Sequence, residues 1–383
     1  MRISAIKFWE TKIKFLLIRR VAPALINLMH SCIPRQKGTL LIIKNDGIGD
    51  YILFRNYLYF LKNSKKYENH KIYLLANLTS KELATSLDSE IVEGFFWYSD
   101  GYFLRWNLIK LLFNLQRLRL ETIIYPNYSR KFTIDWLINK VNAKNKLGVD
   151  GDEINEPFEL KHKTNQYYSE LISVSAGPLH EFERNKQIFE VITGEKCYFE
   201  KPYIEKDKLS ITPNNSIVIF PGASVSDKKW ASTNFNKLCL QIIEQHNTHI
   251  ILAGAKDDIE QGKQISNGIP EEKFSYQAAL NMIELCELIG GANLLISGDT
   301  VAIHIAAALG IPAVCISKGD LYGRFIPYPP RISDKIYCVF PRNFVAGSKN
   351  HNKYSPFIIN DVLLEDVFDT TAMALTSLQA NKN

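Results

Sequence analysis

The sequence predicts an α/β protein of two domains, each built on a mainly parallel sheet. A chain of 383 residues exceeds what one hydrophobic core usually supports, so two domains are expected. Three junctions join a short apolar run to a turn that carries polar residues, at Leu40–Asp50, Ile217–Ser224 and Leu294–His304. Because such strand-to-helix turns aim unpaired backbone N–H groups at a ligand, they indicate two α/β halves that face a shared cleft.

In the first half, apolar runs of strand length alternate with helical patterns, which is typical of parallel α/β layers. The expected strands are Leu40–Lys44, Lys71–Leu75, Phe95–Tyr98 and Thr122–Tyr125. Helices are expected between them, including one that begins near Asp50 and a leucine-rich one over Leu104–Leu118.

The second half repeats the alternation after a polar passage, Lys201–Asn215, that contains two prolines and is the expected linker. Its expected strands are Ile217–Phe220, His249–Leu252, Leu294–Ser297 and Ala313–Ile316, and an amphipathic helix is expected over Ile359–Leu378. The predicted organisation is therefore an N-terminal segment, two domains and a tail with a closing helix, at 1–37, 38–205, 206–340 and 341–383.

Composition excludes several function classes. Apolar residues make up 46% of the chain and charged residues 22%, as in an ordinary globular protein. The net charge of +6 suits an anionic substrate or a membrane surface but is too diffuse to indicate nucleic acid. None of the six cysteines forms a C-x-x-C pair, and Cys239, Cys286 and Cys315 lie in apolar segments. We therefore expect buried thiols of a reducing compartment and no zinc site.

The N-terminal segment interleaves large apolar residues with five basic ones, which are Lys7, Lys12, Lys14, Arg19 and Arg20. No uncharged run reaches the roughly 18 residues that a membrane-spanning helix needs. A basic amphipathic segment that lies on an anionic membrane surface is expected, and a helix packed on the body of the protein is the alternative. A signal peptide with Val21–Met29 as its apolar region is less well supported, since no small-residue cleavage site follows.

The first junction carries Gly47, Gly49 and Asp50 directly after a strand. Ile52 stands where a dinucleotide-binding fingerprint has its third glycine, which argues against a nicotinamide cofactor. The two glycines allow a ligand to approach the backbone closely. Asp50 is either a general base toward a hydroxyl or only a cap at the start of a helix, and local sequence leaves both open.

The second junction runs from Gly222 to Lys228, Lys229 and Trp230. Its turn offers backbone donors, and a lysine can pair with a phosphate group. The alternative is a solvated loop whose tryptophan caps the core.

The third junction places Asp299 and Thr300 at the start of a helix, with His304 one turn further on. Thr300 can donate to a phosphate oxygen, and His304 can support the same ligand or be an ordinary core histidine. No nucleophile elbow is present, and two candidate ligands without a third do not make a metal site.

These motifs, taken together and in order, resemble glycosyltransferase family 9, the ADP-heptose:lipopolysaccharide heptosyltransferases, from about Leu40 to Pro330. The resemblance also rests on His180–Asn185, on Pro221-Gly222-Ala223 with Lys228 two residues before Trp230, on Ala253–Asp257 and on Asp299–Ala308. It implies a GT-B fold of two Rossmann-like domains facing a central cleft, the first for the acceptor and the second for the nucleotide sugar.

The implied activity is inverting transfer of a heptose from ADP-heptose to a lipopolysaccharide core or another lipid-linked glycan, on the inner face of the inner membrane. Asp50 is the implied catalytic base, and neither a cofactor nor a metal is expected. The implied donor-binding residues are Gly222, Lys228, Gly254, Asp299, Thr300 and His304, and the implied acceptor-binding residues are Gly47, Gly49 and Arg184. A non-catalytic sugar-nucleotide or glycan-binding protein and a GT-B-like epimerase are the alternatives.

The chain departs from the family pattern near the donor motifs. Val301 and Ala302 stand where the family usually has glycine and proline, and Lys318–Phe325 replaces a Gly-Pro-[Ser/Thr] loop. Phe274–Leu280 also lacks a motif that is common before the donor site. These departures leave the expected fold unchanged and the donor sugar open.

Overall fold

The computed structural model describes residues 21–31, 34–101, 106–175, 177, 179–222, 226–254, 259–346 and 354–380. Contacts divide the chain into two compact units. Unit 1 combines Met1–Gly47, Tyr57–Ser175 and Arg184–Cys197, and unit 2 combines Ile48–Asn56, Ala176–Glu183 and Tyr198–Asn383. The expected basic segment at residues 7–20 lies outside the described residues.

Unit 1 contains a six-stranded parallel sheet in the order β3-β2-β1-β4-β5-β6. Its strands are β1 (Thr39–Lys44), β2 (Lys71–Asn77), β3 (Val92–Tyr98), β4 (Thr122–Tyr125), β5 (Asn145–Val149) and β6 (Glu170–Ile172). Its helices are α2 (Ala22–Ser31), α4 (Asn56–Asn63), α5 (Lys81–Leu87), α6 (Trp106–Arg117), α7 (Phe132–Lys140), α8 (Phe158–Asn165) and most of α9 (Glu181–Thr193).

The core of unit 1 forms where the apolar face of α6 meets the sheet. Leu108, Leu112 and Leu115 recur at helical spacing and are fully buried against residues of β1 and β4, among them Leu41 and Ile123. The leucine-rich helix expected over 104–118 is therefore confirmed over its described part.

Unit 2 contains a second six-stranded parallel sheet, in the order β12-β11-β10-β7-β8-β9. Its strands are β7 (Ile217–Phe220), β8 (Ile250–Gly254), β9 (Phe274–Ala278), β10 (Leu294–Gly298), β11 (Ala313–Ile316) and β12 (Ile336–Val339). Its helices are α3 (Ile48–Phe54), α10 (Ser232–His246), α11 (Ile259–Ser266), α12 (Met282–Gly290), α13 (Val301–Leu309) and α14 (Leu364–Ala380).

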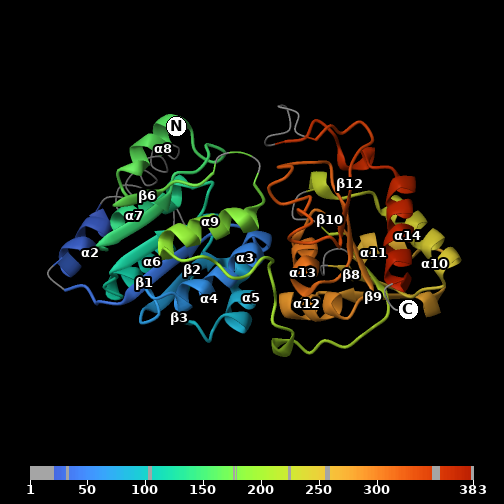
Figure 1. Cartoon of the computed structure of the whole chain (residues 1–383), viewed down its shortest axis with the longest axis horizontal. Helices are drawn as coiled ribbons and strands as arrows, with labels where there is room; N and C mark the ends of the chain where they lie inside the picture. The colour runs from blue at the N-terminus through green and yellow to red at the C-terminus, as the bar shows by residue number, and fades with distance from the viewer. Residues whose placement is uncertain are drawn as a thin grey trace, which may run out of the picture. The chain divides into compact units, whose positions relative to one another are not determined.

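Helices cover both faces of this second sheet, with α10 and α14 on one side and α12 and α13 on the other (Figure 1). Phe235 and Leu238 of α10 and Val367 of α14 pack with Ile219 of β7 in one buried cluster. Trp230 belongs to this cluster and its Nε1 donates to the Val362 carbonyl at 3.1 Å, so the tryptophan after the second junction closes the core.

Both sheets place the first and fourth strands of their half side by side at the centre, the strand order of nucleotide-binding α/β folds. The point where the order reverses lies between β1 and β4 in unit 1 and between β7 and β10 in unit 2. Ligands of such sheets bind beyond the carboxyl ends of the strands at this point. The α/β class and the eight expected strands are therefore confirmed.

Two expectations need correction. The first is that β5, β6, β9 and β12, which are short and carry polar or half-exposed residues, are missing from the strands expected above. The last helix begins at Leu364 rather than Ile359, because Ile359–Asp361 forms a separate 3₁₀ turn whose Asp361 side chain accepts from the Ile358 N–H at 2.9 Å. No helix among the described residues has the length and apolar character needed to span a bilayer.

Candidate functional site

The candidate donor site lies at the carboxyl ends of β7 and β10, which are parallel neighbours in unit 2. Lys228 follows β7 in a short 3₁₀ turn, and Asp299 follows β10 directly. Lys228 Nζ lies 3.1 Å from Asp299 Oδ2, so the two motifs meet at the point where the strand order reverses. Burial acts to lower the pKa of Lys228, but the Asp299 carboxylate outweighs it and raises this pKa above its usual value. Lys228 therefore keeps its positive charge.

Thr300 caps the helix α13 that begins beside this ion pair. Its hydroxyl oxygen accepts from the Ala302 N–H at 3.3 Å and lies 3.0 Å from the Ser297 hydroxyl. The Ile303 N–H donates to the Thr300 carbonyl at 3.2 Å, so among the described residues the Val301 N–H is the first-turn donor left for an anion. Val301, the departure from the family pattern, is the first residue of this helix.

His304 is buried within α13 and makes a hydrogen bond through Nδ1 to the Tyr328 hydroxyl at 2.7 Å. Burial lowers the pKa of His304 to about 4, with a partly opposing contribution from Asp299. The imidazole is therefore neutral at pH 7 and cannot attract a phosphate by charge. Any role it has must come from its shape or from a neutral N–H.

The helix α3 packs on α13 and carries Asp50 as its third residue. A Cβ on Gly49 would lie 3.3 Å from Nε2 of His304 and 2.7 Å from its Cδ2, and the second distance is closer than real Cβ atoms approach. A glycine at position 49 therefore lets the first turn of α3 lie directly against the imidazole. Asp50 is partly exposed, and a carboxylate in the first turn of a helix is favoured by the helix dipole.

Lys318 was not among the residues predicted from the sequence, yet it lines the same small hollow as Lys228 and Asp299. It lies just after β11, and its Nζ is 2.6 Å from Asp227 Oδ2 and 3.2 Å from Asp320 Oδ2. A lysine two residues beyond a parallel strand is the signal that could have identified it. By sequence this segment stands out only as a departure from the family pattern.

The two remaining predicted donor residues have different surroundings. Gly222 is buried two residues after the end of β7, and residues 223–225 beyond it are not described. Gly254 is the last residue of β8, where an added Cβ would meet the Tyr276 hydroxyl at 3.0 Å. The turn that follows Gly254, at residues 255–258, lies outside the described part of the chain.

The predicted acceptor residues Gly47 and Arg184 belong to unit 1. Gly47 is exposed and follows a buried polar network in which Asn127 Nδ2 donates to Asn45 Oδ1 at 3.0 Å. The Arg184 guanidinium lies 3.7 Å above the Tyr128 ring and donates to the Ser175 carbonyl at 3.1 Å. Arg184 is thus buried in contacts of its own unit.

The motif around His180 is also tied into the fold, on the unit 2 side. His180 Nε2 lies 2.9 Å from the Phe325 carbonyl, and the Glu181 carboxylate lies 2.9 Å from Arg324 Nε. His180 is buried, which lowers its pKa to about 4. These contacts hold the segment that leads to Tyr328, the partner of His304, which the sequence analysis did not single out.

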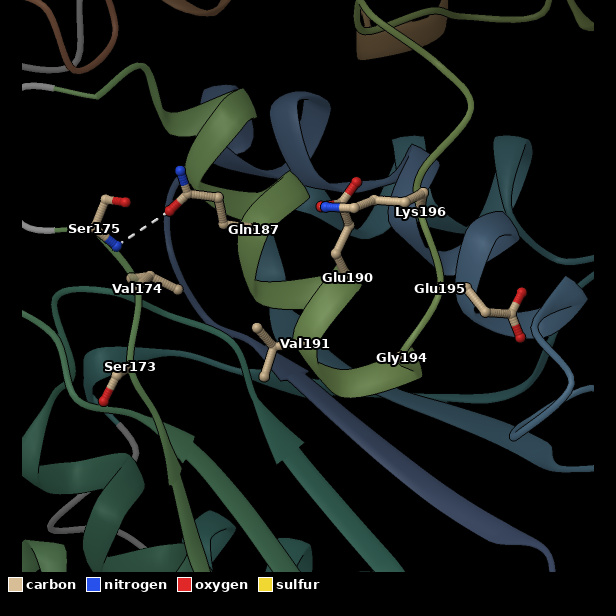
Figure 2. A pocket seen from close by; sticks show the side chains of 9 residues that line it. All are labelled: Ser173, Val174, Ser175, Gln187, Glu190, Val191, Gly194, Glu195 and Lys196. Carbon is tan, nitrogen blue, oxygen red and sulfur yellow. Dashed lines mark hydrogen bonds and ion pairs between the residues drawn. The ribbon is translucent and has the colours of Figure 1, made fainter.

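A separate hollow of about 520 Å³ lies in unit 1, between α9 and the segment Ser173–Ser175. Figure 2 shows Gln187 directed toward Ser175, whose N–H it accepts at 3.1 Å, with Glu190 further along α9 and Lys196 on the segment that follows the helix. None of the predicted site residues lines this hollow. Among the residues described, no group of three or more His, Cys, Asp and Glu side chains is arranged to hold a metal ion.

Comparison with known proteins gives a consistent result. The model of glycosyltransferase family 9 (heptosyltransferase) matches residues 138–333, just over half of the chain. Lipooligosaccharide heptosyltransferase 2 of Haemophilus influenzae is 31% identical over 121 residues, which cover 30% of this chain and 33% of that protein. The enzyme of the same name from Haemophilus ducreyi is 33% identical over 141 residues, or 34% and 39% of the two chains. These matches thus span only about a third of the relatives' own length.

A solved structure of Escherichia coli heptosyltransferase WaaC with ADP-2-deoxy-2-fluoro heptose has a TM-score of 0.67 to this chain. The superposed part covers 88% of this chain and 99% of the WaaC chain, at 15% sequence identity. At that identity the likeness shows the fold alone, which is the two-unit GT-B architecture.

Proposed function

Since the chain belongs to glycosyltransferase family 9, we propose that it transfers a heptose or a related sugar from a nucleoside diphosphate sugar to a surface glycan acceptor. The proposed donor is ADP-heptose and the proposed acceptor is a lipopolysaccharide core. The observation that carries the proposal is the Lys228–Asp299 pair beside the start of α13. A lysine and the N-terminus of a helix therefore lie together at the carboxyl ends of the strands, where nucleotide-binding sheets bind their ligands.

In this proposal the donor diphosphate binds across the start of α13. The phosphate oxygens accept from Lys228 Nζ in place of the Asp299 carboxylate, from the Val301 N–H at the start of α13 and from the Thr300 hydroxyl. Lys318 adds a second cation in the same hollow. These groups stabilise the negative charge that develops on the diphosphate as it leaves, which is the largest demand of the reaction.

Asp50 is the proposed base. Its carboxylate takes the proton from an acceptor hydroxyl while that oxygen forms a bond to the anomeric carbon of the sugar. The bond from this carbon to the diphosphate breaks in the same displacement, so the anomeric configuration inverts and the nucleoside diphosphate leaves. We expect no metal requirement, because cationic side chains and helix N–H groups supply the charge stabilisation.

The acceptor is proposed to bind at Gly47 and the adjoining turn around Gly49, and Arg184, which is buried, is proposed to support it indirectly. A lipid-linked acceptor would place the enzyme at the inner face of the inner membrane. The basic N-terminal segment at residues 7–20 is proposed to hold it there by joint apolar insertion and attraction to anionic lipid.

The experiment is an assay of the full chain with a panel of nucleotide sugars, with and without a heptose-free lipopolysaccharide core. ADP release that depends on the acceptor, together with a product heavier by one heptose, would support the proposal. Donor binding without turnover would indicate a non-catalytic binding protein. Recovery of an epimerised sugar would indicate an epimerase, and either result would refute the proposal.

A further inference from the structure

Tyr328 lies at the centre of a buried group of rings in unit 2. Its hydroxyl is 2.7 Å from Nδ1 of His304, and its ring centroid is 4.5 Å from that of His180. All three side chains are almost fully buried. Neither tyrosine nor histidine is an efficient way to fill an apolar core, so the contacts between these polar groups call for an explanation.

The hydrogen bond between Tyr328 and His304 has a preferred direction. Burial raises the pKa of Tyr328 well above its usual value, so the phenol keeps its proton. Within the residues that the structure describes, His304 Nδ1 is the one hydrogen-bond partner of this hydroxyl. If Nδ1 carried the ring proton and donated instead, the phenolic proton would have no acceptor in a buried place, which is costly. The favoured arrangement has Tyr328 donating to Nδ1.

His180 does not compete for the Tyr328 hydroxyl, because both of its ring nitrogens are engaged elsewhere. The Phe182 N–H donates to Nδ1 at 3.3 Å, and Nε2 then carries the proton and donates to the Phe325 carbonyl at 2.9 Å. His180 therefore holds the Tyr328 ring by van der Waals contact alone, with the two ring planes tilted by 48°. This leaves the hydroxyl directed at His304.

The ring edge of His304 opposite Nδ1 faces α3. Gly49 lies so close to Cδ2 and Nε2 that no side chain fits between the imidazole and the backbone. Asp50 is the next residue along the helix. A displacement of the His304 ring on this side would therefore press directly on the turn that carries this carboxylate.

We propose that Tyr328 is a positioning residue, whose hydroxyl holds the His304 ring with its proton on Nε2 and so sets the place of the first turn of α3 and of Asp50. This inference rests on the proposed function for its catalytic consequence. Its structural part, the choice of tautomer by Tyr328, stands independently. Tyr328 and His304 come from segments far from α3 in sequence, and the three segments come together only in the folded unit 2.

The structural part is tested by nuclear magnetic resonance of the full chain with ¹⁵N-labelled histidine rings. The chain has eight histidines, and the His304 signals are assigned by their loss in His304→Gln. The expected result is an Nε2–H tautomer of His304 in the native chain and a mixture of tautomers in Tyr328→Phe. An Nδ1–H tautomer in the native chain, or an unchanged tautomer in Tyr328→Phe, would overturn the proposal.

The catalytic part is tested by steady-state kinetics of the same variants. Tyr328→Phe is expected to lower kcat by about tenfold to a hundredfold, as small displacements of a reacting group do, and to change the donor KM less than about twofold. His304→Gln, whose amide can replace the Nε2 donor, is expected to keep more activity than His304→Asn. Normal kcat in Tyr328→Phe would contradict the proposal.

Thr371→Val is the matched control, because it also removes one buried hydroxyl from unit 2, on α14, where Thr371 bonds to the Val367 carbonyl at 2.8 Å. It should lose stability without changing the His304 tautomer or kcat. If the native chain shows no transfer at all, the proposed function fails, while the resonance experiment still decides whether Tyr328 sets the tautomer.

Discussion

Replacing Gly49 by alanine probes the contact between α3 and His304 most sharply. The new Cβ would lie 2.7 Å from His304 Cδ2, whereas carbon atoms in contact normally lie about 3.5–4.0 Å apart. Either the imidazole or the first turn of α3 must therefore move by about 1 Å. His304 is held by Tyr328 on its other side, so we expect much of the shift to fall on α3 and on Asp50.

The expected magnitudes follow from two opposing effects. Overpacking of this kind destabilises a protein by about 1–3 kcal/mol. Alanine in a helix is more favourable than glycine by about 0.5–1 kcal/mol, and Gly49 does not have the positive φ that would cancel this gain. Gly49→Ala should therefore lower the free energy of unfolding in the native background. In a His304→Ala background, where the clash is removed, the same substitution should raise it.

The assay is the midpoint of urea unfolding for the two single variants and the double variant, together with kcat for ADP release. A displacement of about 1 Å at a reacting group can cost about a hundredfold in rate, and we expect a loss of that order in Gly49→Ala with donor affinity nearly unchanged. Gly101→Ala is the control, since its Cβ would meet no atom within 4 Å. If Gly49→Ala changed the urea midpoint and kcat no more than this control does, the proposed contact between Gly49 and His304 would be refuted. The same holds if Gly49→Ala lowered the urea midpoint in the His304→Ala background as well.

Three further predictions concern the donor site, the buried histidines and the N-terminus. Lys228→Ala should weaken ADP binding about tenfold to a hundredfold and Lys229→Ala much less, because a charge-assisted contact is worth about 1.5–3 kcal/mol; calorimetric titration with equal effects would refute the assignment. The pKa values of His180 and His304 are lowered to about 4, so the unfolded chain binds more protons between pH 6.5 and 4 and stability falls as the pH drops. Between pH 7 and pH 5 each histidine should lower the free energy of unfolding by about 2 kcal/mol. His180→Gln should make the free energy of unfolding depend less steeply on pH, and equal slopes in the variant and the native chain would contradict this prediction. Removal of residues 1–20, which keeps α2 and its buried Ile26 in the core of unit 1, should release the protein from anionic vesicles while turnover on a short acceptor persists, and continued sedimentation or unfolding would show that residues 1–20 belong to the fold.

Much of the fold could be predicted because its central strands are continuous apolar runs. β1, β4, β7, β10 and β11 are buried on both faces, so their sequences stand out from the helices around them. β9 carries serine and glutamine on a half-exposed edge, and β6 has only three residues, so neither shows the expected pattern. The apolar pattern that identifies a strand is therefore weakest in the least buried strands of the sheets.

The candidate site was predictable to the extent that it lies at strand ends. Lys228, Asp299 and Thr300 follow buried strands directly, and the structure brings them together at the centre of the unit 2 sheet. Tyr328 could not be found in this way, because it lies in an irregular segment between β11 and β12 and acts through a contact with α13. The packing of α3 on α13 joins residues that are about 250 positions apart, which no local pattern reveals.

The central claim, glycosyl transfer with Asp50 as the base, is tested most directly by comparing Asp50→Asn with the native chain. Asparagine keeps the size of the side chain but cannot take the acceptor proton, so kcat should fall by about a hundredfold to ten-thousandfold while ADP affinity stays within a few-fold. Asp334→Asn, which changes an exposed carboxylate of the same unit, should retain normal turnover. Near-normal turnover in Asp50→Asn would show that Asp50 serves only the start of α3, and the proposed mechanism would be wrong.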